Sequence, residues 1–135
     1  MATTNATIAL ASDVTDSSLS ISNTTELNLA GTTTGVNTMT SVTKVLSSTD
    51  QVDLIATGSV STTHAYVYIN NPSIDDSEYF NITIGNAGAG SATDTEEIGR
   101  LYAGDVMWLA WDVDDEISIT PSTANDMTVE YMVFS

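Results

Sequence analysis

The chain has 135 residues, a length that fits one domain, and it contains no Cys, which excludes disulfide bonds, thiolate zinc sites and Cys nucleophiles. Its 18 acidic residues face one Lys and one Arg, and the formal net charge of −16 disfavours binding to nucleic-acid backbones and to anionic membranes. Because we find neither a signal-peptide pattern at its start nor a stretch of membrane-spanning length, we expect the protein to be made in the cytosol and to be soluble.

The predicted secondary structure consists of strands only. Apolar and polar residues alternate with a period of two in many short segments, whereas no window shows the 3.6-residue apolar period of an amphipathic helix. In chain order the predicted strands are 19–22, 26–29, 39–46, 52–57, 65–70, 79–84, 98–102, 106–111, 116–120 and 128–134. Turn-forming residues separate most of them, as at Asn71-Pro72 and Gly104-Asp105. This spacing predicts an all-β fold, an antiparallel β-sandwich that is jelly-roll-like.

Composition changes near residue 38. Up to that point the chain is rich in Thr, Ser and Asn, and every Tyr, Trp and Phe lies beyond it. We therefore predict an extended N-terminal arm over residues 1–38 and a β-sandwich domain over residues 39–135. An arm of this composition buries little apolar surface by itself. We expect it to lie against its own domain, a neighbouring subunit or a larger scaffold, and a flexible tail is the alternative.

Several predicted strands carry apolar side chains on both faces. A strand in a two-layer sandwich needs only one apolar face, because the other meets water. The second face must then contact the arm, another layer or another subunit, and interface cores are enriched in aromatic residues and Met. The candidate interface residues are Tyr66, Tyr68, Trp108, Trp111, Met132 and Phe134. The two Trp side chains point to opposite faces of one strand, so internal burial is the alternative for part of this set.

Four carboxylates are concentrated between two predicted strands, on Asp112, Asp114, Asp115 and Glu116. Calcium takes six to eight oxygen ligands, and a loop of this kind supplies some of them. The segment lacks the Gly and the flanking helices of an EF-hand, which favours a solvated turn. We expect no cofactor, and these four residues are the candidate ligands if the chain binds calcium.

Residues of common catalytic sites are scarce. His64 is the only His, which excludes zinc sites that need two or three His ligands. The nucleophile-elbow pattern G-x-S-x-G does not occur, and among 18 acidic residues some pair will always suit glycoside hydrolysis. We therefore predict that the protein is not an enzyme.

Three segments resemble small structural virion proteins of tailed phages, particularly of marine and cyanobacterial phages. These segments are 65–71 (AYVYINN), 97–105 (EIGRLYAGD) running into 106–112, and 129–134 (VEYMVF). The resemblance implies a sandwich domain that sits on a capsid or a tail, as a trimer or in repeated copies. It assigns no catalytic or ligand-binding residue.

The predicted function is that of a capsid decoration, or cement, protein, made in the host cytoplasm and incorporated into the virion. Its expected partners are the major capsid protein and other copies of itself, with a trimer favoured, and we expect neither nucleic acid nor membrane. The alternative is a carbohydrate- or receptor-binding module on a tail or fibre, which would respond to calcium or to glycans. A non-viral adhesin or matrix subunit is a third hypothesis, against which the missing secretion signal argues.

Overall fold

Every regular element among the described residues is a β-strand. The computed structural model describes residues 3–14, 18–29, 31–85 and 95–135, and the strands among them pair antiparallel. This confirms the predicted all-β antiparallel fold. The chain divides into two compact units, Met1–Asn37 and Thr38–Ser135.

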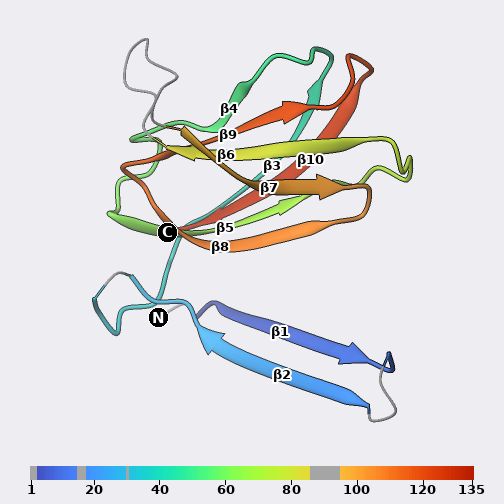
Figure 1. Cartoon of the computed structure of the whole chain (residues 1–135). Coiled ribbons are helices and arrows are strands. Elements are labelled where there is room, and N and C mark those ends of the chain that lie inside the picture. Colours follow the sequence, from blue (N-terminus) through green and yellow to red (C-terminus); the bar gives the residue numbers. More distant parts are fainter. Residues whose placement is uncertain (1–2, 15–17, 30, 86–94) are drawn as a thin grey trace. The chain divides into compact units, whose positions relative to one another are not determined.

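The first unit contains a β-hairpin. β1 (Asn5–Ser12) and β2 (Leu19–Glu26) pair antiparallel over all eight residues of each strand (Figure 1). After β2 the backbone turns back, and the amide of Val36 donates to the carbonyl of Leu27 (2.9 Å). β1 is not among the predicted strands, and the strand predicted at 26–29 begins at the last residue of β2. Thr, Ser, Ala and Asn fill most positions of this part of the chain, so its apolar signal is weak.

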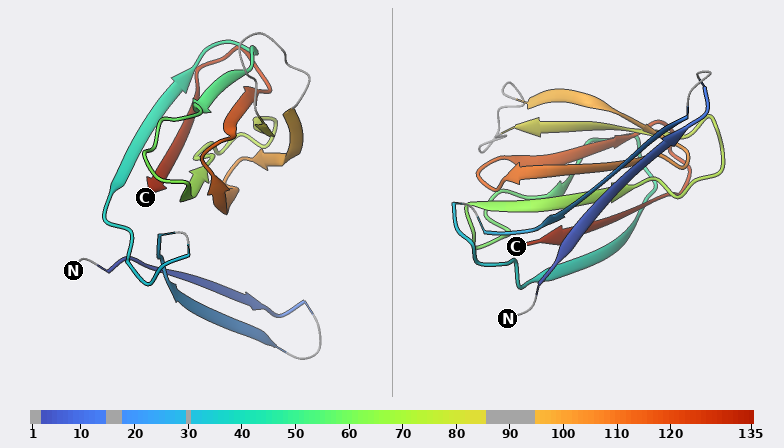
Figure 2. Two further views of the ribbon diagram at one scale, coloured as in Figure 1. Left: turned by 90° about the vertical axis from the view of Figure 1, so that its left-hand side faces the viewer. Right: turned by 90° about the horizontal axis from the view of Figure 1, so that it is seen from below.

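The second unit is a sandwich of two four-stranded antiparallel sheets (Figures 1 and 2). In sheet order, the first consists of β3 (Met39–Leu46), β10 (Met127–Phe134), β5 (His64–Asn70) and β8 (Val106–Asp112). The second consists of β4 (Val52–Ile55), β9 (Glu116–Pro121), β6 (Tyr79–Gly85) and β7 (Thr95–Tyr102). The sequence predicts all eight strands, with some differences in their ends.

Strand pairing in the sandwich is nested along the chain. The first strand of the unit pairs with the last (β3 with β10), and β4 pairs with β9, β5 with β8, and β6 with β7. Each sheet therefore joins strands that lie far apart in the sequence, a pattern typical of slowly folding β-sandwiches. The predicted sandwich is confirmed, and its jelly-roll character stays a prediction.

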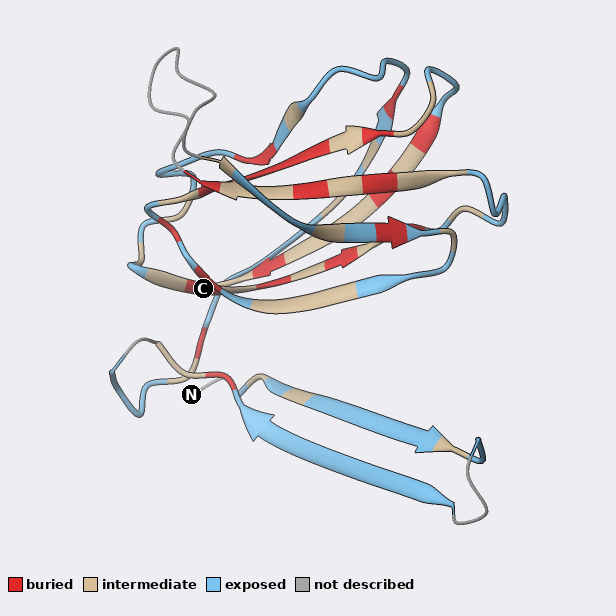
Figure 3. Cartoon of the chain, in the orientation of Figure 1, coloured by how far each residue is buried: buried red, intermediate tan, exposed pale blue. Residues whose placement is uncertain are grey.

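The core lies between the two sheets, where alternate residues of each strand point inward (Figure 3). In β5, Ala65, Val67 and Ile69 are fully buried, and the residues between them are half-buried. The largest buried side chains are Trp111 in β8 and Phe80 in β6. Burial of side chains of this kind contributes on the order of 2 kcal/mol each.

Asn71 ties the two sheets together at a corner of the sandwich. Its buried side-chain amide donates to the carbonyl of Leu101 (3.1 Å), and its side-chain oxygen accepts from the amide of Ser73 (3.2 Å). Its backbone amide donates to the carbonyl of Asp105 (3.0 Å), and its carbonyl accepts from the amide of Gly104 (2.9 Å). Gly104 has a φ of 79°, which side-chain-bearing residues rarely adopt. The corner therefore fixes the turn that carries the chain from β7 into β8.

Candidate interaction surface

The outer face of the β3-β10-β5-β8 sheet carries aromatic and Met side chains. In β5, Tyr66 and Tyr68 alternate with fully buried residues and therefore point away from the core. On one side, β8 places Trp108 opposite Tyr68. On the other side, β10 places Met132 opposite Tyr68 and Phe134 opposite Tyr66. Five of the six predicted interface residues thus share one face.

The rings on this face contact one another. Tyr66 and Trp108 are stacked, with ring centroids 5.9 Å apart and an interplanar angle of 12°. Trp108 also lies 5.7 Å from Phe134, and the ring of His64 meets Tyr66 edge-on at 4.8 Å. Aromatic pairs contribute about 0.5–1.5 kcal/mol beyond their burial. These contacts restrain the rings, so a partner that binds here meets a surface that is already ordered.

Met39 extends the surface to the edge strand β3. It lies opposite Phe134 and is 62% exposed. Met39 is not among the predicted interface residues, because its neighbours on the same face of β3, Ser41 and Thr43, are polar and give no apolar signal. The complete surface, called the aromatic face, consists of Met39, Tyr66, Tyr68, Trp108, Met132 and Phe134.

The aromatic face carries little charge for a chain with a net charge of −16. Only two acidic residues, Glu130 and Asp112, occur in its four strands. The carboxylate of Glu130 accepts a hydrogen bond from the side-chain amide of Asn70 (3.0 Å). Asp112 is the last residue of β8, opposite His64. The carboxylates of the chain are therefore concentrated outside this sheet.

The outer face of the other sheet is more polar where β4, β9 and β6 lie side by side. The hydroxyl of Ser118 in β9 donates to a carboxylate oxygen of Asp53 in β4 (3.1 Å). The hydroxyl of Thr83 in β6 donates to the carbonyl of Ser118 (3.3 Å) and accepts from the side-chain amide of Gln51 (3.4 Å). Polar residues are what a sandwich strand ordinarily carries on the side away from the core. This outer face also carries a smaller aromatic pair, Tyr79 of β6 and Tyr102 of β7, whose ring centroids are 5.4 Å apart, and the guanidinium of Arg100 lies 4.8 Å from the Tyr79 ring.

Trp111 does not belong to this surface. It is 1% exposed and lies opposite Ala65 in the core. Its place in the predicted interface set is therefore wrong. Trp111 is three residues beyond Trp108 in the same strand, and side chains an odd number of residues apart point to opposite faces. Its indole nitrogen is buried without a hydrogen-bond partner in the described part of the chain.

The four candidate calcium ligands span the turn between β8 and β9: Asp112 ends β8, Asp114 and Asp115 lie in the turn, and Glu116 begins β9. The carbonyl of Asp112 accepts from the amide of Asp115 (3.1 Å), and its carboxylate accepts from the amide of Asp114 (3.2 Å). Glu116 is 7% exposed, and its carboxylate accepts from the hydroxyl of Ser118 (3.4 Å). Within the described ranges, no group of three or more His, Cys, Asp or Glu residues is placed to hold a metal ion. The four residues are close in sequence, but their carboxylates do not form a metal-binding group in the described structure. The expected lack of a cofactor stays a prediction.

The hairpin of the first unit also has an apolar side. Leu10 lies opposite Ile21, and the period-two alternation adds two more residues to the same side. This side, called the hairpin face, consists of Ile8, Leu10, Leu19 and Ile21, which are between 48% and 57% exposed. The opposite side carries Thr7 and Thr24, whose hydroxyl oxygens are 2.8 Å apart. An isolated two-stranded hairpin is at best marginally stable in water, so the hairpin face is a second candidate contact surface.

Comparisons of the chain with protein-family models, with curated proteins and with solved structures find no match. Among the described residues, no helix is long and apolar enough to cross a membrane. A functional interpretation therefore depends on the residues of this chain and on their arrangement.

Proposed function

We propose that the protein is a non-enzymatic structural component of a virion, a capsid decoration protein that binds and stabilises the head shell of a phage. The observation that carries the proposal is the aromatic face. Contiguous apolar surface rimmed by polar residues marks interaction sites, and aromatic residues and Met are enriched in interface cores. The rest of the chain is strongly acidic, so repulsion between like charges opposes association through other surfaces. Association with a partner is therefore favoured at the aromatic face, which has little charge.

In this proposal the sandwich is a jelly roll. A jelly roll consists of eight strands in two sheets with Greek-key connections, and it is a fold of viral capsid proteins. Nested pairing of first with last and second with second-last strands supports this assignment. The fold alone does not imply the function, so the proposal rests mainly on the surface.

The proposed partners are other copies of this chain, with a trimer favoured, and the major capsid protein. Each of the two units has an apolar surface, the aromatic face on the sandwich and the hairpin face on the hairpin, which suits a protein that contacts both its own copies and a shell. Repeated copies on a shell add their contacts through avidity. The resemblance to phage virion proteins favours a head shell over other large assemblies.

A charge placed on the aromatic face tests the proposal. Met132→Glu puts a carboxylate opposite Tyr68, at the centre of the face. The matched control, Thr120→Glu, puts the same group on the outer face of the other sheet, in its strand β9. Light scattering gives the mass of each full-length variant, and circular dichroism melting shows whether it is folded.

We expect the parent and the Thr120→Glu variant to be oligomers at concentrations where Met132→Glu is a folded monomer. A buried unpaired carboxylate at an interface opposes association strongly. If the parent and both variants share one oligomeric mass, the aromatic face is not the contact between copies.

A further inference from the structure

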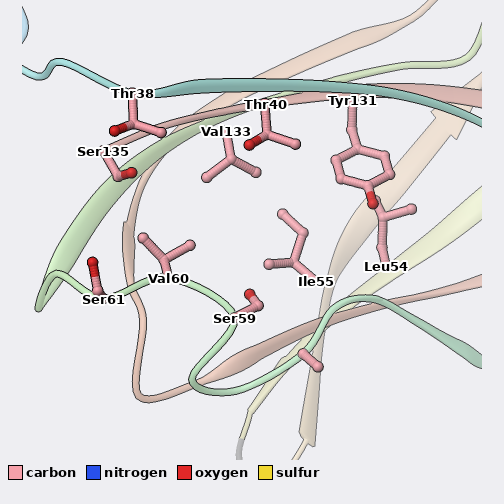
Figure 4. A pocket seen from close by; sticks show the side chains of 11 residues that line it. Thr38, Thr40, Leu54, Ile55, Ser59, Val60, Ser61, Tyr131, Val133 and Ser135 are labelled. Atoms are coloured by element: carbon pink, nitrogen blue, oxygen red, sulfur yellow. The ribbon is translucent and has the colours of Figure 1, made fainter.

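A cavity of about 290 Å³ opens between the two sheets, beside the edge strands β3 and β4 (Figure 4). Its origin is a difference in strand length. β3 has eight residues and pairs with β10 over its full length, whereas β4 has only four and ends at an irregularity near Ile55. The first half of β3 therefore has no strand across from it. The chain after β4 lines the far side of the opening instead.

The inner walls of the cavity are apolar. Figure 4 shows Val133 and Tyr131 on one side and Ile55 and Val60 on the other. Val133 and Ile55 belong to the buried core, and Val60 and Tyr131 are packed against it. The cavity thus reaches the core and is not confined to surface loops.

Hydroxyl groups surround these apolar walls. Five of them have no hydrogen-bond partner for their side chains among the described residues: Thr40, Ser59, Ser61, Tyr131 and Ser135. Each hydroxyl can both donate and accept a hydrogen bond. Burial raises the pKa of Tyr131, so its hydroxyl is protonated at neutral pH. These groups are available to water or to a ligand that supplies matching hydroxyls.

No charged side chain is among the residues that line the cavity. This neutrality is unusual in a chain with 18 acidic residues. No basic side chain is placed here to pair with an anion, and no acidic side chain to pair with a metal ion or an ammonium group. A purely apolar ligand would displace water from the five hydroxyls without replacing their hydrogen bonds, which is unfavourable.

We propose that this cavity binds a neutral, hydroxyl-rich molecule the size of one sugar ring. A pyranose combines C–H groups that suit the apolar walls with hydroxyls that suit the rim. The volume lies at the lower end of the range for ligand pockets, which limits the occupant to a single ring. The same chemistry is presented by a free sugar and by the terminal residue of a glycan. The site lies between the sheets, so it is independent of the docking function proposed for the outer aromatic face.

The test is a titration of the full-length protein followed by amide chemical shifts. The probes are glucose, galactose and mannose, their methyl glycosides, and cyclohexanol as a ring of similar size with one hydroxyl. Tyr131→Phe removes one cavity hydroxyl and keeps the ring. The matched control is Tyr68→Phe, which removes a Tyr hydroxyl from the opposite face of the same sheet.

We expect at least one sugar to cause saturable shifts around Thr40 and Ser59–Ser61, with a dissociation constant on the order of 1 mM. Tyr131→Phe should weaken this binding about fivefold, the usual effect of one lost hydrogen bond, and Tyr68→Phe should leave it unchanged. Tighter binding of the methyl glycosides would indicate that the site takes the terminal residue of a glycan. Tighter binding of the free sugars would indicate that it takes a free sugar from solution. The proposal is overturned if no sugar saturates the shifts, if Tyr131→Phe binds like the parent, or if cyclohexanol binds as tightly as the sugars.

Discussion

The indole ring of Trp108 stacks on the ring of Tyr66 at a centroid distance of 5.9 Å, although the two residues are not directly opposite each other. The residue opposite Tyr66 is Ala110, whose small side chain leaves the space beside the ring open to the indole two residues away. The stack therefore runs diagonally across β5 and β8. It joins the two strands on the outer side of the sheet and makes the aromatic face one connected surface.

The two Trp residues of β8 should respond very differently to truncation. Trp111→Ala leaves a cavity in the core and should lower the free energy of unfolding by about 3–5 kcal/mol. Trp108→Ala removes a half-buried side chain and should lower it by about 1–2 kcal/mol in the monomer. Urea unfolding followed by circular dichroism measures both. Equal losses would contradict the assignment of one Trp to the core and the other to the surface.

Asn71 should matter far more than its neighbour Asn70. Asn71→Ala removes two hydrogen bonds made by a buried side chain and leaves the carbonyl of Leu101 without its donor, so we expect a loss of about 1–3 kcal/mol. Asn70→Ala removes one hydrogen bond to Glu130 on the outer face and should cost less than about 1 kcal/mol. The same urea experiment compares them, and similar losses would show that the corner does not depend on the Asn71 side chain.

Tyr131 should make the protein less stable at high pH. Burial raises the pKa of its hydroxyl above the ordinary value of 10.0, so the folded state favours the neutral form. This contribution is fully present below about pH 10 and is lost as the pH rises through the folded-state pKa. The melting temperature of the parent should therefore fall more steeply above about pH 10 than that of Tyr131→Phe. The two proteins differ only in this hydroxyl, so the difference between the two curves reports on Tyr131, and parallel curves would contradict the prediction.

The strands of the sandwich could be predicted because short segments rich in Val, Ile, Tyr and Trp lie between turn-forming residues, and because side chains in a strand alternate between its two faces. The same alternation correctly places Trp108 and Trp111 on opposite faces of one strand. It does not say which face meets the core, since that depends on pairing between segments far apart in the sequence. Trp111 was therefore included in the interface set, and Met39 was left out of it.

The hairpin and the cavity lay outside what sequence patterns could show. β1 consists largely of Ala and Thr around Ile8 and Leu10, which gives a weak strand signal. The predicted strand 52–57 is two residues longer than β4, and it is the early end of β4 that leaves the cavity open. A local irregularity in pairing, such as the one between Asp53 and Ile55, has no reliable sequence signal.

The most direct test of the central claim is the solution mass of the unmodified full-length chain, measured by light scattering over a range of concentrations. If the aromatic face is a contact between copies, the mass will be a multiple of the 14.2 kDa of one chain, with about 43 kDa expected for the favoured trimer. A mass of 14.2 kDa at every concentration would contradict that claim.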